Sequence, residues 1–301
     1  MHWSCRQKTF SLKSLYIKSL SANIIDYMEQ ETKRDPFKNR IHEIDFLRGL
    51  LMFLVILDHL FNLLMSFNKG WAHVSTGDNI QPFYTIYQVA NFYWTNPART
   101  IVRWICLGSF CFVSGLSCAF SKNNWKRAGQ MIALWFAILV VSNILQAINA
   151  TYDLNVGIRT FRVDFNIIGV LAWSTLIYCF VQDKPWKWLV IVGAIGLLIH
   201  PVCVLLSWTE WGKNAYAIPL WRPSAVIADQ ADFMPLFPYL SCFFGGALLS
   251  KFTYSVSKKS YFKQYEWERP FCFVGRHSLI IYGTHFLLLI GIFAFVGLFI
   301  K

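Results

Sequence analysis

Residues 40–61 read RIHEIDFLRGLLMFLVILDHLF, and this stretch decides the fold. The apolar run that it opens, 44–67, has the roughly 20 residues that an α-helix needs to cross the ~30 Å hydrocarbon layer of a bilayer. Ionisable residues interrupt the run at Asp45, Arg48 and His59. The stretch therefore predicts a transmembrane helix that carries costly polar groups for a purpose.

The rest of the chain repeats this pattern. Of its 301 residues, 55% are apolar, 18% aromatic and only 15% charged, which is too apolar for a water-soluble domain of this length. We expect an all-α fold, a polytopic membrane helix bundle of about seven transmembrane helices. A cytosolic basic tail (1–43) is expected to precede the transmembrane domain (44–301), and a helix in the outer interface is expected over 79–94. The predicted spans are 44–67, 99–121, 128–149, 165–182, 186–208, 233–252 and 275–300.

Lysine and arginine residues indicate the orientation. Most of them fall in the tail and in alternate loops, which places the N-terminus inside. The net charge of +12 forms no basic stripe between exposed aromatic residues, so no nucleic-acid partner is expected. The eight cysteines lie mostly inside apolar runs without metal-ligand spacing, and neither a metal site nor a disulfide framework is predicted.

Polar residues of the first span share one face. Asp45, Arg48 and His59 lie 3 and 11 positions apart, and 11 residues at ~100° each return close to the starting direction. Asp45 and Arg48 are spaced to pair near the inner interface, and His59 lies roughly 16 Å further along the helix. Asn62 extends this face, whereas Asp58 points about 100° away from His59.

Later spans add further polar residues. Arg103 lies in the second span, one turn after Arg99, and Tyr282 and His285 share one face of the last span. A last span that runs from inside to outside brings His285 to about the depth of His59. The sequence therefore predicts that the two histidines and Tyr282 line one cavity.

Structural interpretations compete with these functional ones. The Asp45–Arg48 pair is also suited to fixing the depth of the span, and a buried His59 to joining two helices by a hydrogen bond. Arg99 and Arg103 could merely reach the lipid headgroups.

Three other features are interpreted from their position. His200, before Pro201, is expected to be structural. Asp232 is expected to cap the outer end of the sixth span or to bind an acceptor at the mouth of a cavity. The small residues of 114–119 and the pair Gly245-Gly246 predict close helix crossings.

The motifs in their order are similar to those of a known family. After the first span, with its Asp45, Arg48, Gly49 and His59, come SFCFVSGLSCAFSK (109–122), ADFMPLFPYLSCFFGGALLSK (231–251) and GRHSLIIYGTHF (275–286). Together they resemble the heparan-alpha-glucosaminide N-acetyltransferase catalytic-domain family, especially its bacterial members. The arginine-glycine followed by histidine is also similar to the acyltransferase-3 membrane enzymes.

This resemblance implies an acyl-CoA-dependent acyltransferase. Such an enzyme moves an acetyl or similar acyl group from cytosolic acyl-CoA to a sugar amine or hydroxyl of an envelope or extracytoplasmic glycan. His59 is the expected general base with His285 second, and either could instead carry the acyl group covalently. Arg103 or Tyr282 is expected to donate to the oxyanion. The CoA phosphates are expected to bind at Arg48, Arg276, Lys122, Lys126 and Arg127. The acceptor is expected to bind at Asp232 and Asn62.

The chain departs from the relatives at two positions. Bacterial members carry a glycine-x-leucine-histidine stretch in mid-bundle, and here GVLA (169–172) has Ala172 in place of the histidine. Asn62 stands where an acidic residue often follows the first-span histidine. If that histidine contributes to chemistry in the relatives, the activity here is expected to be differently arranged or lost.

Two other classes of function remain open at this point. A transporter or flippase could use the same polar residues for proton relay or cargo binding without chemistry, and a structural membrane subunit could use them for packing. In every case the lipid bilayer is a partner, the expected location is a bacterial cytoplasmic membrane, and the oligomeric state is open.

Overall fold

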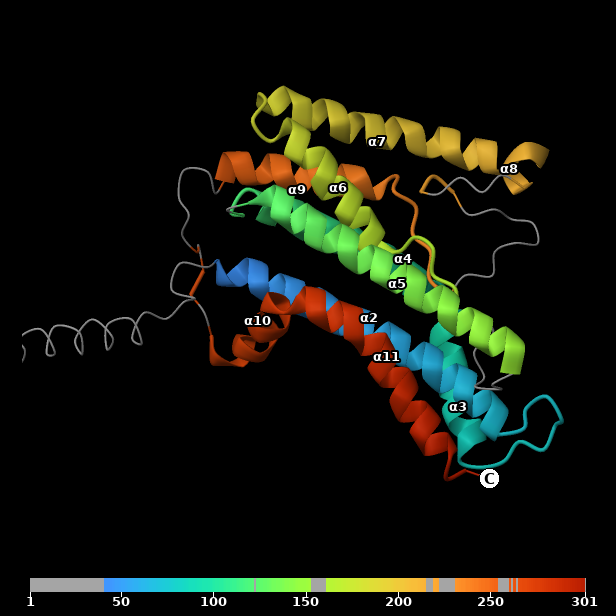
Figure 1. Cartoon of the computed structure of the whole chain (residues 1–301). Helices are drawn as coiled ribbons and strands as arrows, with labels where there is room; N and C mark the ends of the chain where they lie inside the picture. Colours follow the sequence, from blue (N-terminus) through green and yellow to red (C-terminus); the bar gives the residue numbers. More distant parts are fainter. Residues whose placement is uncertain are drawn as a thin grey trace, which may run out of the picture. The chain divides into compact units, whose positions relative to one another are not determined.

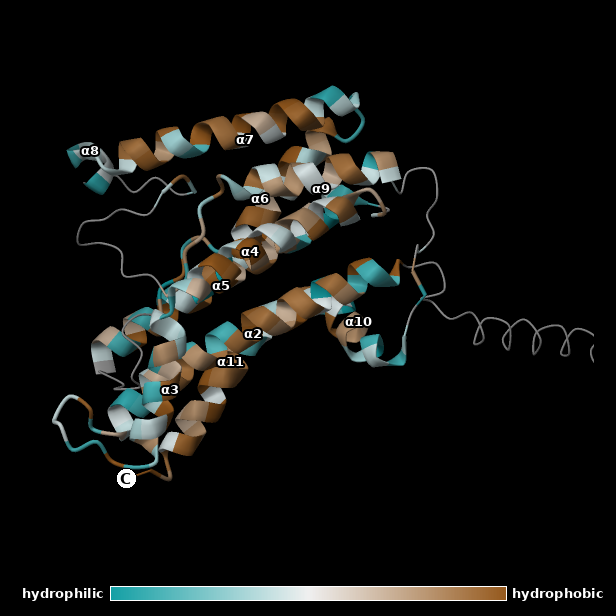
Figure 2. Ribbon diagram, turned by 180° about the vertical axis from the view of Figure 1, so that it is seen from behind, coloured by the Kyte–Doolittle hydropathy of each residue, from teal (hydrophilic) through white to brown (hydrophobic). Residues whose placement is uncertain are grey.

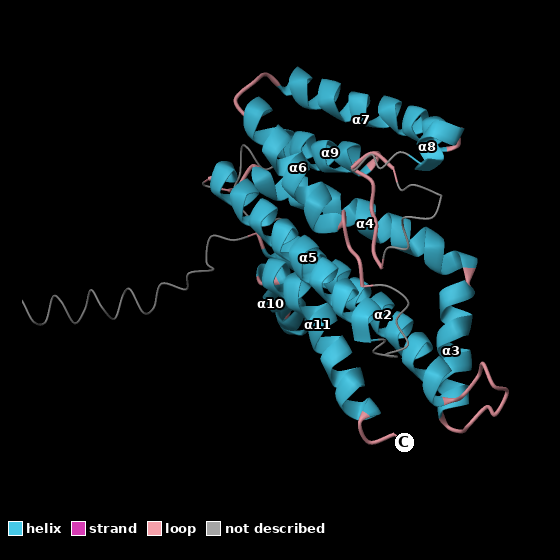
Figure 3. Ribbon diagram, turned by 45° about the vertical axis from the view of Figure 1, so that its right-hand side comes forward, coloured by secondary structure: helices cyan, strands magenta, loops and turns pink. Residues whose placement is uncertain are grey.

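The computed structural model describes residues 41–121, 123–152, 161–214, 219–221, 231–253, 260, 262–263 and 265–300. The expected tail, Lys122 and several other residues lie outside this part. Within it, all regular secondary structure is helical (Figure 3). The helices are α2 (His42–Trp71), α3 (Phe83–Thr95), α4 (Pro97–Cys118), α5 (Asn124–Tyr152), α6 (Ile167–Val181), α7 (Trp186–Ser207), α8 (Glu210–Asn214), α9 (Tyr239–Thr253), the short 3₁₀-helix η1 (Glu266–Glu268), α10 (Arg269–Arg276) and α11 (Ser278–Gly297).

The all-α membrane fold is confirmed. Five helices of the described residues, α2, α4, α5, α7 and α11, are long and apolar enough to cross a membrane. Helices α6 and α9 also occupy predicted spans but have 15 residues each, which extends only roughly 22 Å. The count of seven spans and the orientation of the N-terminus stay predictions.

Two predicted spans have different boundaries. The sixth span was expected over 233–252, but α9 begins only at Tyr239. The last was expected as one helix over 275–300, and the chain instead breaks at His277 between α10 and α11. The expected interfacial stretch contains helix α3, which runs from Phe83.

Contacts between helices follow a simple order. Helix α10 packs on α2, α2 on α4, α4 on α9 and α9 on α7 (Figure 1). Helix α11 continues from α10 along α2, and α6 lies between α5 and α9. The residues that line the candidate site come from α2, α3, α4, α5 and α11 and from the non-helical segments 161–166 and 231–233.

Glycines bring two of these helix pairs into backbone contact. A Cβ atom on Gly49 of α2 would lie 1.8 Å from the Phe271 carbonyl oxygen of α10, and one on Gly275 would lie 1.8 Å from the Asp45 carbonyl oxygen. Neither distance is possible for a side chain, so only glycine permits this crossing. The crossing holds Asp45 beside the arginine of α10 that follows Gly275.

Helices α4 and α9 cross in the same way. A Cβ atom on Gly115 would lie 1.9 Å from the Phe243 carbonyl oxygen, and one on Gly246 would lie 1.9 Å from the Phe112 carbonyl oxygen. The predicted close contact of the small-residue run and of Gly246 is confirmed. Gly245 instead faces the Phe112 ring.

Large apolar side chains cover the outward faces of α5, α7 and α11, which Figure 2 shows as mostly hydrophobic ribbons. Such faces are unsuited to water and are normal against lipid. On α11 only Tyr282 and His285 are buried. The polar face predicted for the last span is thus turned inward, away from the apolar surface.

Two non-helical segments, 161–166 and 231–238, lie side by side. Phe161 N–H donates to Gln146 on α5 at 2.8 Å, and Ser142 of α5 bonds both the N–H and the carbonyl of Val163 at 3.2 Å. The second segment is attached to the first, because Ala231 N–H donates to the Arg162 carbonyl at 2.8 Å. These bonds fix the backbone from which Asp232 projects.

Candidate functional site

The two histidines singled out in the sequence meet. The ring centroids of His59 on α2 and His285 on α11 lie 5.1 Å apart at an interplanar angle of 50°. Tyr282, one turn before His285, has its ring centroid 5.4 Å from that imidazole. The predicted convergence of these three side chains is therefore confirmed, while their chemical roles stay a prediction.

His285 has a defined tautomer. Its Nδ1 lies 2.8 Å from the Tyr282 carbonyl oxygen and 3.2 Å from the Ile281 carbonyl oxygen. A carbonyl only accepts hydrogen bonds, so Nδ1 must carry the proton. In the neutral ring Nε2 then holds a lone pair, and this atom is buried with no hydrogen-bond partner among the described residues. A buried unpaired acceptor of this kind is costly in free energy.

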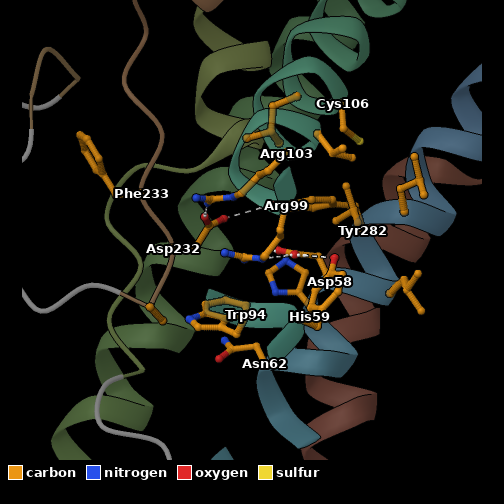
Figure 4. A pocket seen from close by; sticks show the side chains of 17 residues that line it. Asp58, His59, Asn62, Trp94, Arg99, Arg103, Cys106, Asp232, Phe233 and Tyr282 are labelled. Atoms are coloured by element: carbon orange, nitrogen blue, oxygen red, sulfur yellow. Dashed lines mark hydrogen bonds and ion pairs between the residues drawn. The ribbon is translucent and has the colours of Figure 1, made fainter. Parts of the chain in front are cut away.

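Asp232 joins three elements of the site. Its Oδ1 lies 3.3 Å from Nη2 of Arg103 on α4, and the Tyr282 hydroxyl donates to its Oδ2 at 3.5 Å (Figure 4). The expectation that Asp232 caps the sixth span is wrong, because α9 begins seven residues later and the carboxylate points to α4 and α11. The alternative, an acid at the mouth of a cavity, matches its position.

Sequence reasoning missed a second ion pair. Arg99 donates from Nε and Nη2 to the two carboxylate oxygens of Asp58 at 2.7 and 2.8 Å, and both side chains are largely buried. The guanidinium stands over the Trp94 ring, 3.5 Å from its centroid. Arg99 therefore does not simply reach for headgroups. The sequence showed only that Asp58 lies off the His59 face of the helix, and it did not indicate a partner.

Tyr93 completes this cluster from α3. Its hydroxyl donates to Asp58 Oδ1 at 3.1 Å. Burial, together with the nearby Asp58 carboxylate, raises the pKa of the Tyr93 phenol. The phenol thus stays protonated at neutral pH and holds the carboxylate in place as a donor.

Two cavities meet at the histidines. The first, which we call the polar cavity, has a volume of about 300 Å³ and contains both ion pairs (Figure 4). The second, the apolar cavity, has a volume of about 280 Å³ and lies between α5, α11 and the segment 161–166. Their shared wall consists of His59, Asn62, Ala231, Asp232 and Tyr282. His285 lines only the apolar cavity.

The expected CoA-binding residues form a separate group near the start of α2. The predicted Asp45–Arg48 pair is confirmed at 3.6 Å, and Arg276 Nε lies 3.5 Å from the same carboxylate. Arg48 also donates to Ser117 and, at 3.4 Å, to the Gly275 carbonyl. Two guanidinium groups thus share the Asp45 carboxylate.

Helix α5 adds to this group. Arg127 donates to the Ser114 hydroxyl at 2.9 Å, and Lys126 beside it is exposed. Among the described residues, no group of histidine, cysteine, aspartate or glutamate has the arrangement of a metal site.

Comparison with known proteins gives one match. No curated protein and no solved structure is detectably similar to the chain. A sequence model of one family, described as heparan-alpha-glucosaminide N-acetyltransferase, catalytic, matches residues 82–287. The matched residues contain Arg103, Asp232, Tyr282 and His285, whereas the first span with His59 lies before them. Because the match covers more than half of the chain, this protein belongs to the heparan-alpha-glucosaminide N-acetyltransferase catalytic-domain family.

Proposed function

We propose that this membrane protein transfers an acetyl or similar acyl group from acyl-CoA to the amine or hydroxyl of a sugar. The family implies an acetyltransferase activity. The observation that carries the proposal is the convergence of His59, His285 and Asp232 on cavities inside a bundle of apolar helices. Ionisable groups inside a bundle of apolar helices cost free energy, which makes them candidates for a function.

The reaction requires little from the protein beyond positioning of the substrates, proton transfer and stabilisation of the oxyanion. The acceptor nitrogen or oxygen attacks the thioester carbonyl, a C–N or C–O bond forms, and the C–S bond breaks. The proton lost by the acceptor ends on the sulfur, so the products are the acylated sugar and free CoA. A thioester is already activated, so the protein must hold both substrates, take the proton and stabilise the oxyanion.

His59 is our choice for the general base. It is the imidazole that lines both cavities, so it borders the space on either side of the shared wall. His285 is the second candidate, because its buried Nε2 lone pair has no other partner among the described residues. In a two-step reaction this nitrogen would carry the acyl group.

Arg103 suits stabilisation of the oxyanion, and Asp232 suits binding of the acceptor. The Arg103 side chain is 39% exposed and contacts Asp232 through one of its nitrogens. A guanidinium has five N–H donors, so others can face a developing negative charge. Asp232 is placed to hold an amine or hydroxyl, with Tyr282 as its positioning donor. Asn62, on the shared wall, offers the acceptor an amide.

The donor is proposed to enter from the end where α2 begins. Arg48 lies 11 residues before His59, which is roughly 16 Å along the helix. Arg276, Lys126 and Arg127, and outside the described residues Lys122, are the cations proposed to meet the CoA phosphates. The acceptor would be an envelope glycan on the opposite side, and the location a bacterial cytoplasmic membrane.

Proteoliposomes test this proposal and separate it from transport. Glucosamine is trapped inside the vesicles, acetyl-CoA is added outside, and the lumenal sugar is analysed by mass spectrometry. We expect N-acetylglucosamine to accumulate with the wild-type protein and not with His59→Ala. A transporter would change the location of the sugar without changing its mass, and that result with intact protein contradicts the enzyme proposal.

A further inference from the structure

The apolar cavity is larger than the reaction of an acetyl group requires. An acetyl group adds one methyl to the carbonyl carbon, whereas this cavity has a volume of about 280 Å³ beside the histidines. Its walls away from the histidines are almost entirely aliphatic or aromatic. They are formed by Leu134, Ala137, Ile138, Val141, Leu145 and Phe161 together with Val163, Phe286 and Leu287.

The polar residues of this wall are already engaged. Ser142 bonds to the Val163 backbone at 3.2 Å, and Asn166 accepts from the N–H groups of Ile168 and Gly169 at the start of α6. Neither side chain needs a polar ligand. The remaining polar groups gather at the shared wall around His59. The cavity therefore has one reactive end and one apolar end.

This asymmetry distinguishes the occupants of the two cavities. The polar cavity holds two ion pairs and the Trp94 and Tyr93 side chains, which suits a sugar. A sugar lacks the apolar surface that would pack against the aliphatic wall of the apolar cavity. A thioester carbonyl placed at His59 and His285 would have the apolar cavity directly beside it for the rest of its acyl group.

We infer that the apolar cavity binds the alkyl chain of the acyl donor, so that the enzyme accepts acyl groups longer than acetyl. This inference rests on the proposed acyltransferase function. The reaction is unchanged: the acceptor displaces CoA from R–CO–S–CoA, and R lies against Ala137 and Val141 of α5. Each buried CH₂ contributes about 0.8 kcal/mol, which corresponds to roughly fourfold in kcat/KM.

A donor series tests the inference. Acetyl-, butanoyl- and hexanoyl-CoA are compared with glucosamine as the acceptor, and acyl-glucosamine is measured by mass spectrometry. We expect kcat/KM to rise about fourfold per added CH₂ until the cavity is full. The Ala137→Phe and Val141→Phe variants place a ring in the cavity, so each should lower the hexanoyl-to-acetyl ratio at least tenfold.

Ala147→Phe is the matched control, because Ala147 is exposed on the same helix and is not among the residues that line the cavity. The Ala147→Phe variant should keep the wild-type hexanoyl-to-acetyl ratio of kcat/KM. If acetyl-CoA is used but longer donors are not favoured, or if both filling variants leave the ratio unchanged, the inference is overturned and the acyltransferase proposal survives. If no donor gives acyl-glucosamine, the proposed function itself fails.

A further experiment determines whether the alkyl chain in the apolar cavity belongs to the acyl donor or to the acceptor. Octyl glucosaminide carries its chain on the acceptor, so it is compared with glucosamine at fixed acetyl-CoA. We expect the ratio of their kcat/KM values to be the same in Ala137→Phe and in the wild type. A selective loss of octyl glucosaminide would assign the apolar cavity to a lipid-linked acceptor and would overturn the donor assignment.

Discussion

The imidazoles of His59 and His285, on the first and the last long helix, lie with ring centroids 5.1 Å apart in the wall of one cavity. Among the described residues, neither imidazole joins the two helices by a hydrogen bond, because His285 donates to the carbonyls of its own helix. Its remaining nitrogen is directed into buried space. This geometry is the basis for assigning proton transfer to the pair.

Replacing His59 with alanine should remove transfer. General base catalysis typically contributes 10²- to 10⁴-fold, so we expect kcat to fall by at least about 100-fold. His200→Ala is the control, since His200 is not among the residues that line the two cavities and should retain activity. The measurement is acetyl-glucosamine formation, with size-exclusion elution to check folding. Near-normal turnover of well-folded His59→Ala would transfer the role to His285.

The roles of Tyr282 and Arg103 can be distinguished by the effects of their substitution on the kinetics. The Tyr282 hydroxyl is 3.5 Å from Asp232, a long hydrogen bond whose loss costs less than about 1 kcal/mol, or about fivefold in kcat/KM. Arg103→Gln removes the proposed oxyanion donor and should lower kcat by about 10²- to 10³-fold. If Tyr282→Phe instead causes the larger loss, the hydroxyl is the oxyanion donor.

The Asp58–Arg99 pair should behave as a coupled unit in stability measurements. Removing one partner leaves the other charge largely buried, so Asp58→Asn or Arg99→Gln alone should cost about 2 kcal/mol or more. The double variant should cost less than the sum, with a coupling energy of about 1–3 kcal/mol. Unfolding by denaturant in mixed micelles measures all three. Additive losses would show that the two side chains stabilise the bundle independently.

Helical periodicity was sufficient to predict most of the fold and one half of the site. Apolar runs located α2, α4, α5, α6, α7, α9 and α11, although two of the predicted boundaries were wrong, and the spacing of Tyr282 and His285 placed both on one face of α11. These inferences succeed because 100° per residue is a local property of the chain. The Asp45–Arg48 pair was predictable for the same reason.

Apart from the meeting of His59 with His285, contacts between distant segments were beyond this reasoning. The role of Asp232 depends on a segment held by a hydrogen bond between Ala231 and Arg162, and no periodic signal marks an extended stretch inside a bundle. The partner of Asp58 could not be chosen either. Asp58 has several possible cations along the chain, and only the packing of α4 on α2 brings Arg99 to it.

A charge change near the start of α5 should affect the donor and not the acceptor. Lys126→Gln should raise KM for acetyl-CoA about twofold to fivefold at low salt, the range expected for an exposed charge, and the effect should shrink as salt rises. S-acetyl-pantetheine lacks the nucleotide phosphates and should show no change. Lys69→Gln, in the last turn of α2, is the control. An equal effect on both donors would remove Lys126 from phosphate binding.

The crossing of α2 and α10 should be intolerant of a single methyl group. Gly49→Ala would place a Cβ atom 1.8 Å from the Phe271 carbonyl oxygen, so the helices must separate and the arginine cluster around Asp45 must shift. We expect a loss of about 1–3 kcal/mol or more, with reduced transfer. Gly129→Ala is the matched control, because nothing lies within 4 Å of that position and alanine favours helix by up to about 1 kcal/mol. Thermal unfolding in detergent should therefore shift down for Gly49→Ala and stay level or rise for Gly129→Ala. An unchanged transition for Gly49→Ala would mean that α2 and α10 are not in backbone contact, and the position assigned to Arg276 beside Asp45 would be wrong as well.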